Sequence, residues 1–180
     1  KPLASTGFIA VALAAGGLET PYGLVVLVAL VLCWVGDVFL IPKGASGLFL
    51  VGLVSFLLGH VGFVVAFTLC GPDPLWMAAA ALLVFPPAVV VLRWLHPNLS
   101  EKMRLAVVAY VVVISLMVVT AAGAAASTGR GAIGLGAVCF YVSDLHVARD
   151  RFVSRSFWNK SWGLPLYYAA QLILASTVST

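Results

Sequence analysis

The chain has 180 residues, of which 63% are hydrophobic and only 9% are charged, and its mean hydropathy is +1.13. Soluble domains contain roughly 25% charged residues, so this composition excludes a water-soluble globular protein and predicts that lipid is the solvent. The length suits a single transmembrane domain over residues 1–180. The three cysteines lie in or beside apolar runs, where an odd number favours packing over a disulfide framework.

Continuous apolar runs separated by short polar, glycine or proline breaks predict seven transmembrane helices. A spanning helix needs about 20 residues, and the first run is short by this measure. Continuous runs lack the alternation of a membrane β-barrel, so we predict an all-α, polytopic transmembrane bundle. In the fourth span, Pro86 and Pro87 should kink the helix. The predicted spans are Leu3–Gly17, Tyr22–Leu40, Leu48–Cys70, Leu75–Leu95, Arg104–Ala126, Gly131–Val147 and Leu164–Thr180.

The basic residues predict the orientation of these spans. When the loops are assigned alternately to two sides of the membrane, Arg130 is the one basic residue on its side. The opposite side then holds Lys1, Lys43, Arg93, Lys102, Arg104, Arg149, Arg151, Arg155 and Lys160. By the positive-inside rule, this second side is predicted to be cytoplasmic. The net charge of +4 therefore requires no nucleic acid partner.

Three ionisable side chains stand out inside the predicted spans, where such groups are costly and commonly functional. Asp37 and Asp144 lie a few residues from the cytoplasmic ends of the second and sixth spans. His60 lies deeper in the third, roughly 18 Å from its cytoplasmic end at ~1.5 Å per residue. Three further polar residues share helical faces with each other or with Asp144: Tyr141, Tyr168 and Gln171. We predict that these groups, from four helices, line one cavity in the cytoplasmic half.

Each of these residues also has a structural interpretation. An aspartate near a helix end can extend its carboxylate to the interface, and buried polar side chains can hydrogen-bond between helices. A metal site would require three helices to bring together four residues: Asp37, His60, Asp144 and His146. We predict no metal and no cofactor. The sequence contains no phosphate-binding loop, paired-cysteine motif or Gly-x-Ser-x-Gly elbow.

Several strings occur in an order that resembles the YhhN-like, or TMEM86, family, whose characterised members are lysoplasmalogenases. They are GDVFL at 36–40, GLVSFLLGH at 52–60, Ser143-Asp144 with Ala148 and Arg151-Phe152, and YYAAQ at 167–171. The start of the chain resembles that family's second span. Because the family has eight helices, the resemblance implies one further helix upstream of Lys1. Departures from the family pattern occur at Phe63, His146 and Val147.

The resemblance implies hydrolysis of the vinyl ether bond of a lysoplasmalogen, a lysophospholipid that would enter from the membrane lipid. The expected products are a fatty aldehyde and a glycerophospho-ethanolamine or -choline. Glycosidases also form an oxocarbenium-like species, and they use a pair of carboxyl groups as acid and as base or nucleophile. We therefore predict Asp37 and Asp144 as an acid/base pair that titrates together, with either one as the acid. Predicted positioning residues are His60, Tyr141, Ser143, Tyr168 and Gln171, with Arg149 and Arg151 holding the phosphate.

A different class of function remains open from the residues. Buried aspartates and a histidine also serve the proton relays of transporters and proton-linked carriers. Transporters often contain repeated halves with matching helix breaks, whereas this chain has one Pro-Pro break with no counterpart, which favours the enzyme. A structural or partner-binding membrane protein is a third reading, but it leaves the buried acids unexplained. The sequence makes no prediction of the oligomeric state.

Overall fold

The computed structural model describes residues 2–41 and 46–179, and every regular element in these ranges is helical. Lys1 and Lys43, and the side chain of Lys160, lie outside what the structure describes. The helices are α1 (Pro2–Ala14), α2 (Pro21–Phe39), α3 (Ser46–Leu69), α4 (Pro74–Leu95), α5 (Glu101–Thr128), α6 (Gly131–Ala148) and α7 (Phe157–Ser176). A 3-10 turn, η1 (His96–Asn98), follows α4, and a π-helical turn, η2 (Arg149–Val153), follows α6. The predicted all-α class is confirmed.

Five of the helical segments in the described ranges are long and apolar enough to cross a membrane. They are Pro21–Phe39, Gly47–Leu69, Pro74–Asn98, Glu101–Thr128 and Gly131–Val153. The apolar part of α1, Leu3–Ala14, is shorter, in agreement with the short first span expected from the sequence. The chain is therefore a multi-pass membrane protein, and the number of spans agrees roughly with the prediction.

The start of α7 is the largest error in the predicted boundaries. The sequence placed it at Leu164, but the helix begins at Phe157. The hydroxyl of Ser156 accepts a hydrogen bond from the backbone N–H of Trp158 at 3.2 Å and caps the helix there. Pro165 then lies inside the helix, which continues past it although proline cannot donate a backbone hydrogen bond.

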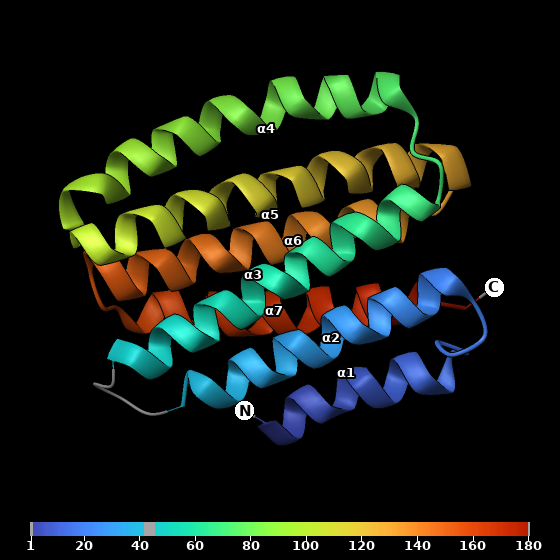
Figure 1. The fold of residues 1–180 in the computed structure, drawn as a ribbon, viewed down its shortest axis with the longest axis horizontal. Helices are drawn as coiled ribbons and strands as arrows, with labels where there is room; N and C mark the ends of the chain where they lie inside the picture. Colours follow the sequence, from blue (N-terminus) through green and yellow to red (C-terminus); the bar gives the residue numbers. More distant parts are fainter. Residues whose placement is uncertain (1, 42–45, 180) are drawn as a thin grey trace.

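In the other helices, proline occurs both in first turns and in a helix interior. Pro21 and Pro74 occupy the first turns of α2 and α4, where a missing N–H has no consequence. The side chains of Thr20 and Asp73 cap these two helices by accepting hydrogen bonds from backbone N–H groups. The Pro86-Pro87 pair lies within a continuous α4, which curves across the molecule in Figure 1.

Contacts between neighbouring helices form a closed ring in the order α2, α3, α5, α6, α7 and back to α2. Helix α1 packs outside this ring against α2 and α7, and α4 packs outside it against α5. In Figure 1 these two helices accordingly form opposite edges of the bundle. The interior of the ring contains fully buried aromatic side chains, including Phe63, Phe67 and Phe140. The polar residues described below project into this ring.

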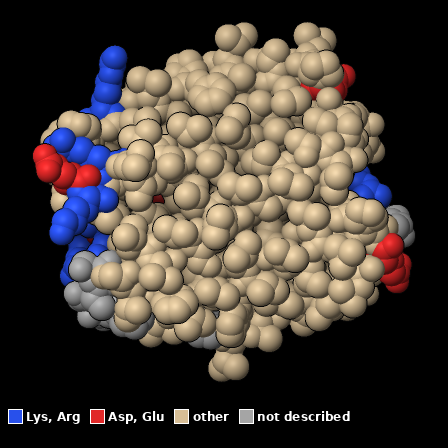
Figure 2. Space-filling view, in the orientation of Figure 1, with Lys and Arg blue, Asp and Glu red and all other residues tan. Residues whose placement is uncertain are grey.

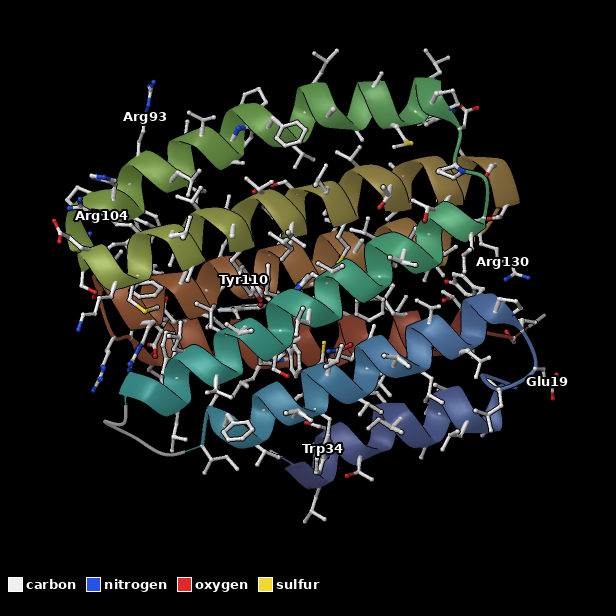
Figure 3. The ribbon with its side chains drawn as sticks, viewed as in Figure 1. Glu19, Trp34, Arg93, Arg104, Tyr110 and Arg130 are labelled. Carbon is white, nitrogen blue, oxygen red and sulfur yellow. The ribbon has the colours of Figure 1, made fainter. Side chains whose placement is uncertain are left out.

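The charged residues on the surface gather at the ends of the bundle. In Figure 2 most of the visible surface is uncharged, and the lysines and arginines concentrate at one end. Figure 3 places Arg93 and Arg104 at that end, and Arg130 with Glu19 at the opposite end. This arrangement, with apolar helices between two charged ends, is the one expected for a bundle that crosses a bilayer.

The close packing of α2 against α3 gives a first testable prediction. A Cβ atom at Gly59 would lie 2.8 Å from Cys33 Sγ and 3.2 Å from the carbonyl oxygen of Ala29, so the helices would have to move apart. We expect Gly59→Ala to destabilise the protein by about 1–3 kcal/mol, as overpacking does, and to lower its unfolding temperature in detergent. Gly47→Ala in the same helix is the control, because its Cβ would meet no atom within 4 Å. Equal unfolding temperatures for the two variants would contradict the prediction.

Candidate active site

A cavity of about 720 Å³ lies between the helices of the ring and the C-terminal part of α4, and it extends to the basic end of the bundle. Its walls are mostly apolar, with side chains such as Leu53, Phe56 and Val111. The carboxyl groups of Asp37 and Asp144 both line it. We call this cavity the chamber. Its volume is within the range of roughly 300–1,000 Å³ that small-molecule sites occupy.

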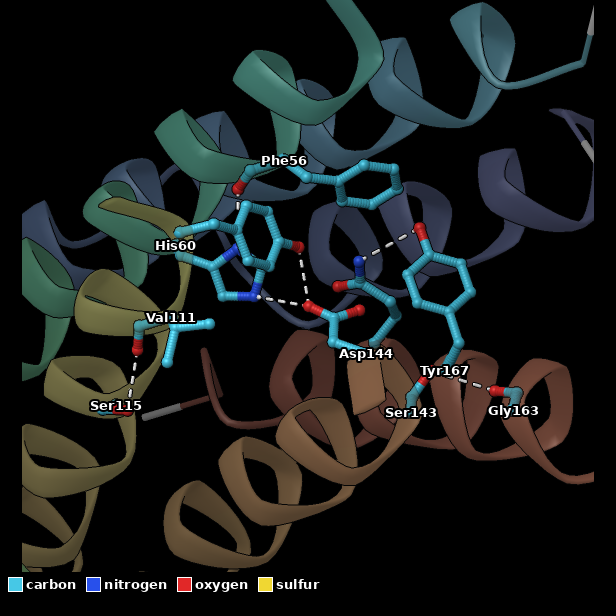
Figure 4. A network of polar contacts seen from close by, with 10 residues as sticks. Phe56, His60, Val111, Ser115, Ser143, Asp144, Gly163 and Tyr167 are labelled. Carbon is cyan, nitrogen blue, oxygen red and sulfur yellow. Dashed lines mark hydrogen bonds and ion pairs between the residues drawn. The ribbon is translucent and has the colours of Figure 1, made fainter. Parts of the chain in front are cut away.

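Asp144 on α6 is held by two other helices of the ring. The hydroxyl of Tyr110 on α5 donates a 2.6 Å hydrogen bond to Asp144 Oδ2. His60 on α3 places its Nε2 atom 3.5 Å from the same oxygen. Figure 4 shows the carboxyl group between these contacts, and Figure 3 shows Tyr110 in the interior of the bundle. Three helices therefore meet at this carboxyl group.

The other ring nitrogen of His60 determines which tautomer is present. Its Nδ1 atom lies 2.6 Å from the carbonyl oxygen of Phe56, and a carbonyl oxygen can only accept, so Nδ1 carries a hydrogen. In a neutral imidazole, Nε2 then has a lone pair directed at the Asp144 carboxyl. Two facing lone pairs repel, so the contact is favourable when one proton belongs to the His60–Asp144 pair. His60 itself is fully buried.

Asp37 on α2 has different surroundings. Its Oδ2 atom accepts a 2.6 Å hydrogen bond from the Ser5 hydroxyl on α1 and a 2.7 Å hydrogen bond from the Tyr167 hydroxyl on α7. The side-chain amide of Gln171 donates in turn to the Tyr167 hydroxyl at 3.2 Å. Asp37 is 2% exposed. Two hydroxyl donors on one carboxyl oxygen form the arrangement expected around an ionised carboxylate, which can only accept.

The predicted positioning residues occupy different places. Tyr141 and Ser143 line the chamber. The Tyr141 hydroxyl is buried without a hydrogen-bond partner, whereas Ser143 donates to the carbonyl oxygen of Gly163 at 3.0 Å and joins α6 to α7. Gln171 donates a hydrogen bond to the Tyr167 hydroxyl and is not part of the chamber wall. Tyr168 is half-buried beside Tyr167 and also lies outside the wall.

The basic residues at the mouth of the chamber differ partly from those predicted. Arg151 lines the mouth, with its guanidinium 4.0 Å above the centre of the Phe49 ring. Arg149 is exposed and is not part of the wall, whereas Arg155 is. His146 also lines the chamber, and its Nδ1 lies 2.9 Å from the carbonyl oxygen of Val142. Among the described residues, no three histidine, cysteine or acidic side chains are grouped as a metal site.

Sequence reasoning did not select Tyr110, Tyr167 or Ser5, which hydrogen-bond to the two aspartates. A usable signal was present for Tyr167. It precedes Gln171 by four residues and therefore shares its helical face, as Tyr168 does with a spacing of three. Tyr110 and Ser5 lie in apolar helices with no spacing relation to an acidic residue. They reach the aspartates only through the tertiary packing of α1 and α5, which the sequence pattern does not reveal.

The fold and the chamber together define a multi-pass membrane protein with two carboxyl groups on the wall of an apolar interior cavity. Residues 1–178 match the family described as the YhhN family, and the chain belongs to that family. No solved structure matches the chain.

Two named relatives are similar over most of the chain. A protein of Bos taurus named lysoplasmalogenase TMEM86A is 33% identical over 156 residues, which cover 83% of this chain and 63% of the relative. A Mycobacterium bovis protein named lysoplasmalogenase is 32% identical over 176 residues, covering 92% of this chain and 65% of the relative. The chain thus spans somewhat less than two thirds of the length of these relatives.

Proposed function

We propose that this chain hydrolyses the vinyl ether bond of lysoplasmalogens within the membrane, releasing a fatty aldehyde and a glycerophosphoethanolamine or glycerophosphocholine. The observation that carries the proposal is the pair of carboxyl groups, Asp37 and Asp144, in unlike surroundings on the wall of one chamber. The names of the relatives from Bos taurus and Mycobacterium bovis agree with it.

The first chemical step assigns a role to Asp144. Hydrolysis of a vinyl ether begins when an acid protonates the alkenyl carbon that does not carry oxygen. The electron pair of the double bond forms the new C–H bond, and an oxocarbenium ion results. Asp144 supplies this proton, because the His60–Asp144 contact is favourable when the pair holds one proton. Tyr110 keeps the carboxyl group in position.

The second step assigns a role to Asp37. Water adds to the oxocarbenium carbon, and Asp37 accepts the proton that the water loses. Its hydrogen bonds from Ser5 and Tyr167 suit a carboxylate that accepts, and its negative charge stabilises the cation. The hemiacetal then breaks its bond to the glycerol oxygen, which receives a proton while the hemiacetal hydroxyl loses one. The aldehyde and the glycerol alcohol leave, and both carboxyl groups return to their starting states.

The polarity of the chamber gives the substrate a direction. An alkenyl chain fits the apolar wall between helices, and Arg151 and Arg155 at the mouth attract the phosphate. The basic end, including Arg93 and Arg104, is assigned to the cytoplasm by the positive-inside rule. The substrate thus enters from the lipid with its head group toward the cytoplasmic interface.

An aldehyde-release assay tests the proposal. Purified protein in detergent micelles is given a 1-alkenyl lysophospholipid, and a 1-alkyl lysophospholipid with the same head group serves as the control substrate. We expect aldehyde from the alkenyl compound alone, with and without a chelator. Absence of aldehyde from well-folded protein would refute the proposed reaction, and proton-coupled uptake by vesicles containing the protein would support the transporter instead.

A further inference from the structure

The mouth of the chamber contains a buried polar atom that the proposed reaction does not use. Asn159, in the first turn of α7, is 3% exposed and lines the chamber. Its side-chain nitrogen donates to the carbonyl oxygen of Ser154 at 2.8 Å and lies 3.5 Å from Asp150 Oδ1. These two acceptors fix the orientation of the amide. The atom left without a partner is therefore the oxygen, Asn159 Oδ1, which is an acceptor.

A carboxylate lies beside the same amide group, next to its nitrogen. Asp150, in η2, also lines the chamber, and its Oδ1 accepts a hydrogen bond from the backbone N–H of Ser156 at 3.2 Å. Arg151 and Arg155 line the same mouth, but within the described ranges the structure records no ion pair between either arginine and Asp150. The mouth thus offers two positive groups and, separately, a negative group with a neutral acceptor next to it.

The separation of these groups from the aspartates fits the length of a head group. Six residues separate Asp144 from Asp150, a rise of about 9 Å in a helix, and eight separate Asn159 from Tyr167, a rise of about 12 Å. In a glycerophosphoethanolamine, nine bonds join the ether oxygen to the ammonium nitrogen, which span roughly 11 Å when extended at bond lengths near 1.5 Å. An ether bond beside the aspartates therefore brings the ammonium group to Asp150 and Asn159.

We infer that Asn159 Oδ1 and the Asp150 carboxylate form a subsite for a primary ammonium group, which makes the chamber selective for ethanolamine over choline head groups. This inference rests on the proposed lysophospholipid substrate and adds its head-group preference. A primary ammonium has three N–H donors to satisfy both acceptors. The quaternary ammonium of choline has none. Such groups are usually held by aromatic faces, and the face of Phe49 at this mouth is already covered by Arg151.

A binding measurement in detergent tests the subsite. The ligands are 1-alkyl lysophosphoethanolamine and 1-alkyl lysophosphocholine of equal chain length, which contain no vinyl ether. We expect the unchanged chain to bind the ethanolamine ligand on the order of tenfold more tightly, the effect of a hydrogen bond to a charged group. Asn159→Ala should bring this ratio close to one by weakening ethanolamine binding. Asn98→Ala, an exposed asparagine in η1 at the same end, should keep the ratio.

A second variant protects the test against misfolding of Asn159→Ala. Asp150→Asn keeps the size and an acceptor oxygen but removes the charge, so binding of the ethanolamine ligand should fall about tenfold. Equal binding of the two ligands by the unchanged chain, or full ethanolamine affinity in Asp150→Asn, would overturn the inference. Selective binding without aldehyde release would refute only the proposed reaction. Aldehyde release without selectivity would refute only the subsite.

Discussion

An Asp144→Asn variant should release aldehyde from a lysoplasmalogen roughly 10²–10⁴-fold more slowly than the unchanged chain, which is the usual loss on removing a general acid. An amide has the shape of a carboxyl group and can still accept the hydrogen bond of Tyr110, but it has no acidic proton to give to the alkenyl carbon. Initial rates over a range of substrate-to-detergent ratios measure the effect. The variant should have a lower kcat and a nearly unchanged KM, because the substrate's chain and head group bind elsewhere in the chamber.

Asp73→Asn is the matched control for this experiment. Asp73 caps α4 at the opposite end of the bundle, and asparagine caps helices equally well. Its activity and unfolding temperature should equal those of the unchanged chain. If Asp144→Asn released aldehyde at the same rate as Asp73→Asn, Asp144 would not be the acid.

An Asp37→Asn variant should lose activity over a similar range of roughly 10²–10⁴-fold, but for a different reason. Protonation of the alkene still occurs, whereas water is no longer deprotonated as it attacks and the oxocarbenium ion is less stabilised. Ser5 and Tyr167 can both still donate to the amide oxygen, so the fold should be retained. The same assay, combined with unfolding in detergent, separates loss of activity from loss of structure.

Azide distinguishes the two roles. It is an anionic nucleophile that needs no deprotonation, so it should restore consumption of the vinyl ether in Asp37→Asn. It should not do so in Asp144→Asn, in which the oxocarbenium ion does not form. Restoration in both variants, or in Asp144→Asn alone, would contradict the assignment of acid and base.

The transmembrane helices were predictable because their physical cause is local. Each requires a run of apolar residues long enough for the bilayer, and turn residues such as Pro21 and Pro74 mark where the next run begins. The start of α7 was not predictable in this way. The hydroxyl cap at Ser156 lies outside the apolar run that begins at Leu164, and the helix continues through Pro165.

The site was predictable only where a residue is unusual for a membrane interior. Asp37, His60 and Asp144 stand out because burying an ionisable group in lipid is costly. Tyr110 does not stand out, since a tyrosine in an apolar helix is unremarkable until packing brings Asp144 to it. Arg155 rather than Arg149 reaches the chamber. A π-helical turn, Arg149–Val153, begins at Arg149, and its period differs from the 3.6 residues of an α-helix.

The hydrogen bonds of Asp37 connect the beginning of the chain to its end, and this has a consequence for biosynthesis. Ser5 is made before Asp37, but Tyr167 is made 130 residues after it. At a synthesis rate of roughly 5–20 residues per second, α2 waits on the order of ten seconds for its second hydroxyl donor. During that interval the nascent protein holds an acidic residue in the membrane without its hydrogen bond from Tyr167. The chamber is therefore completed only when α7 enters the membrane.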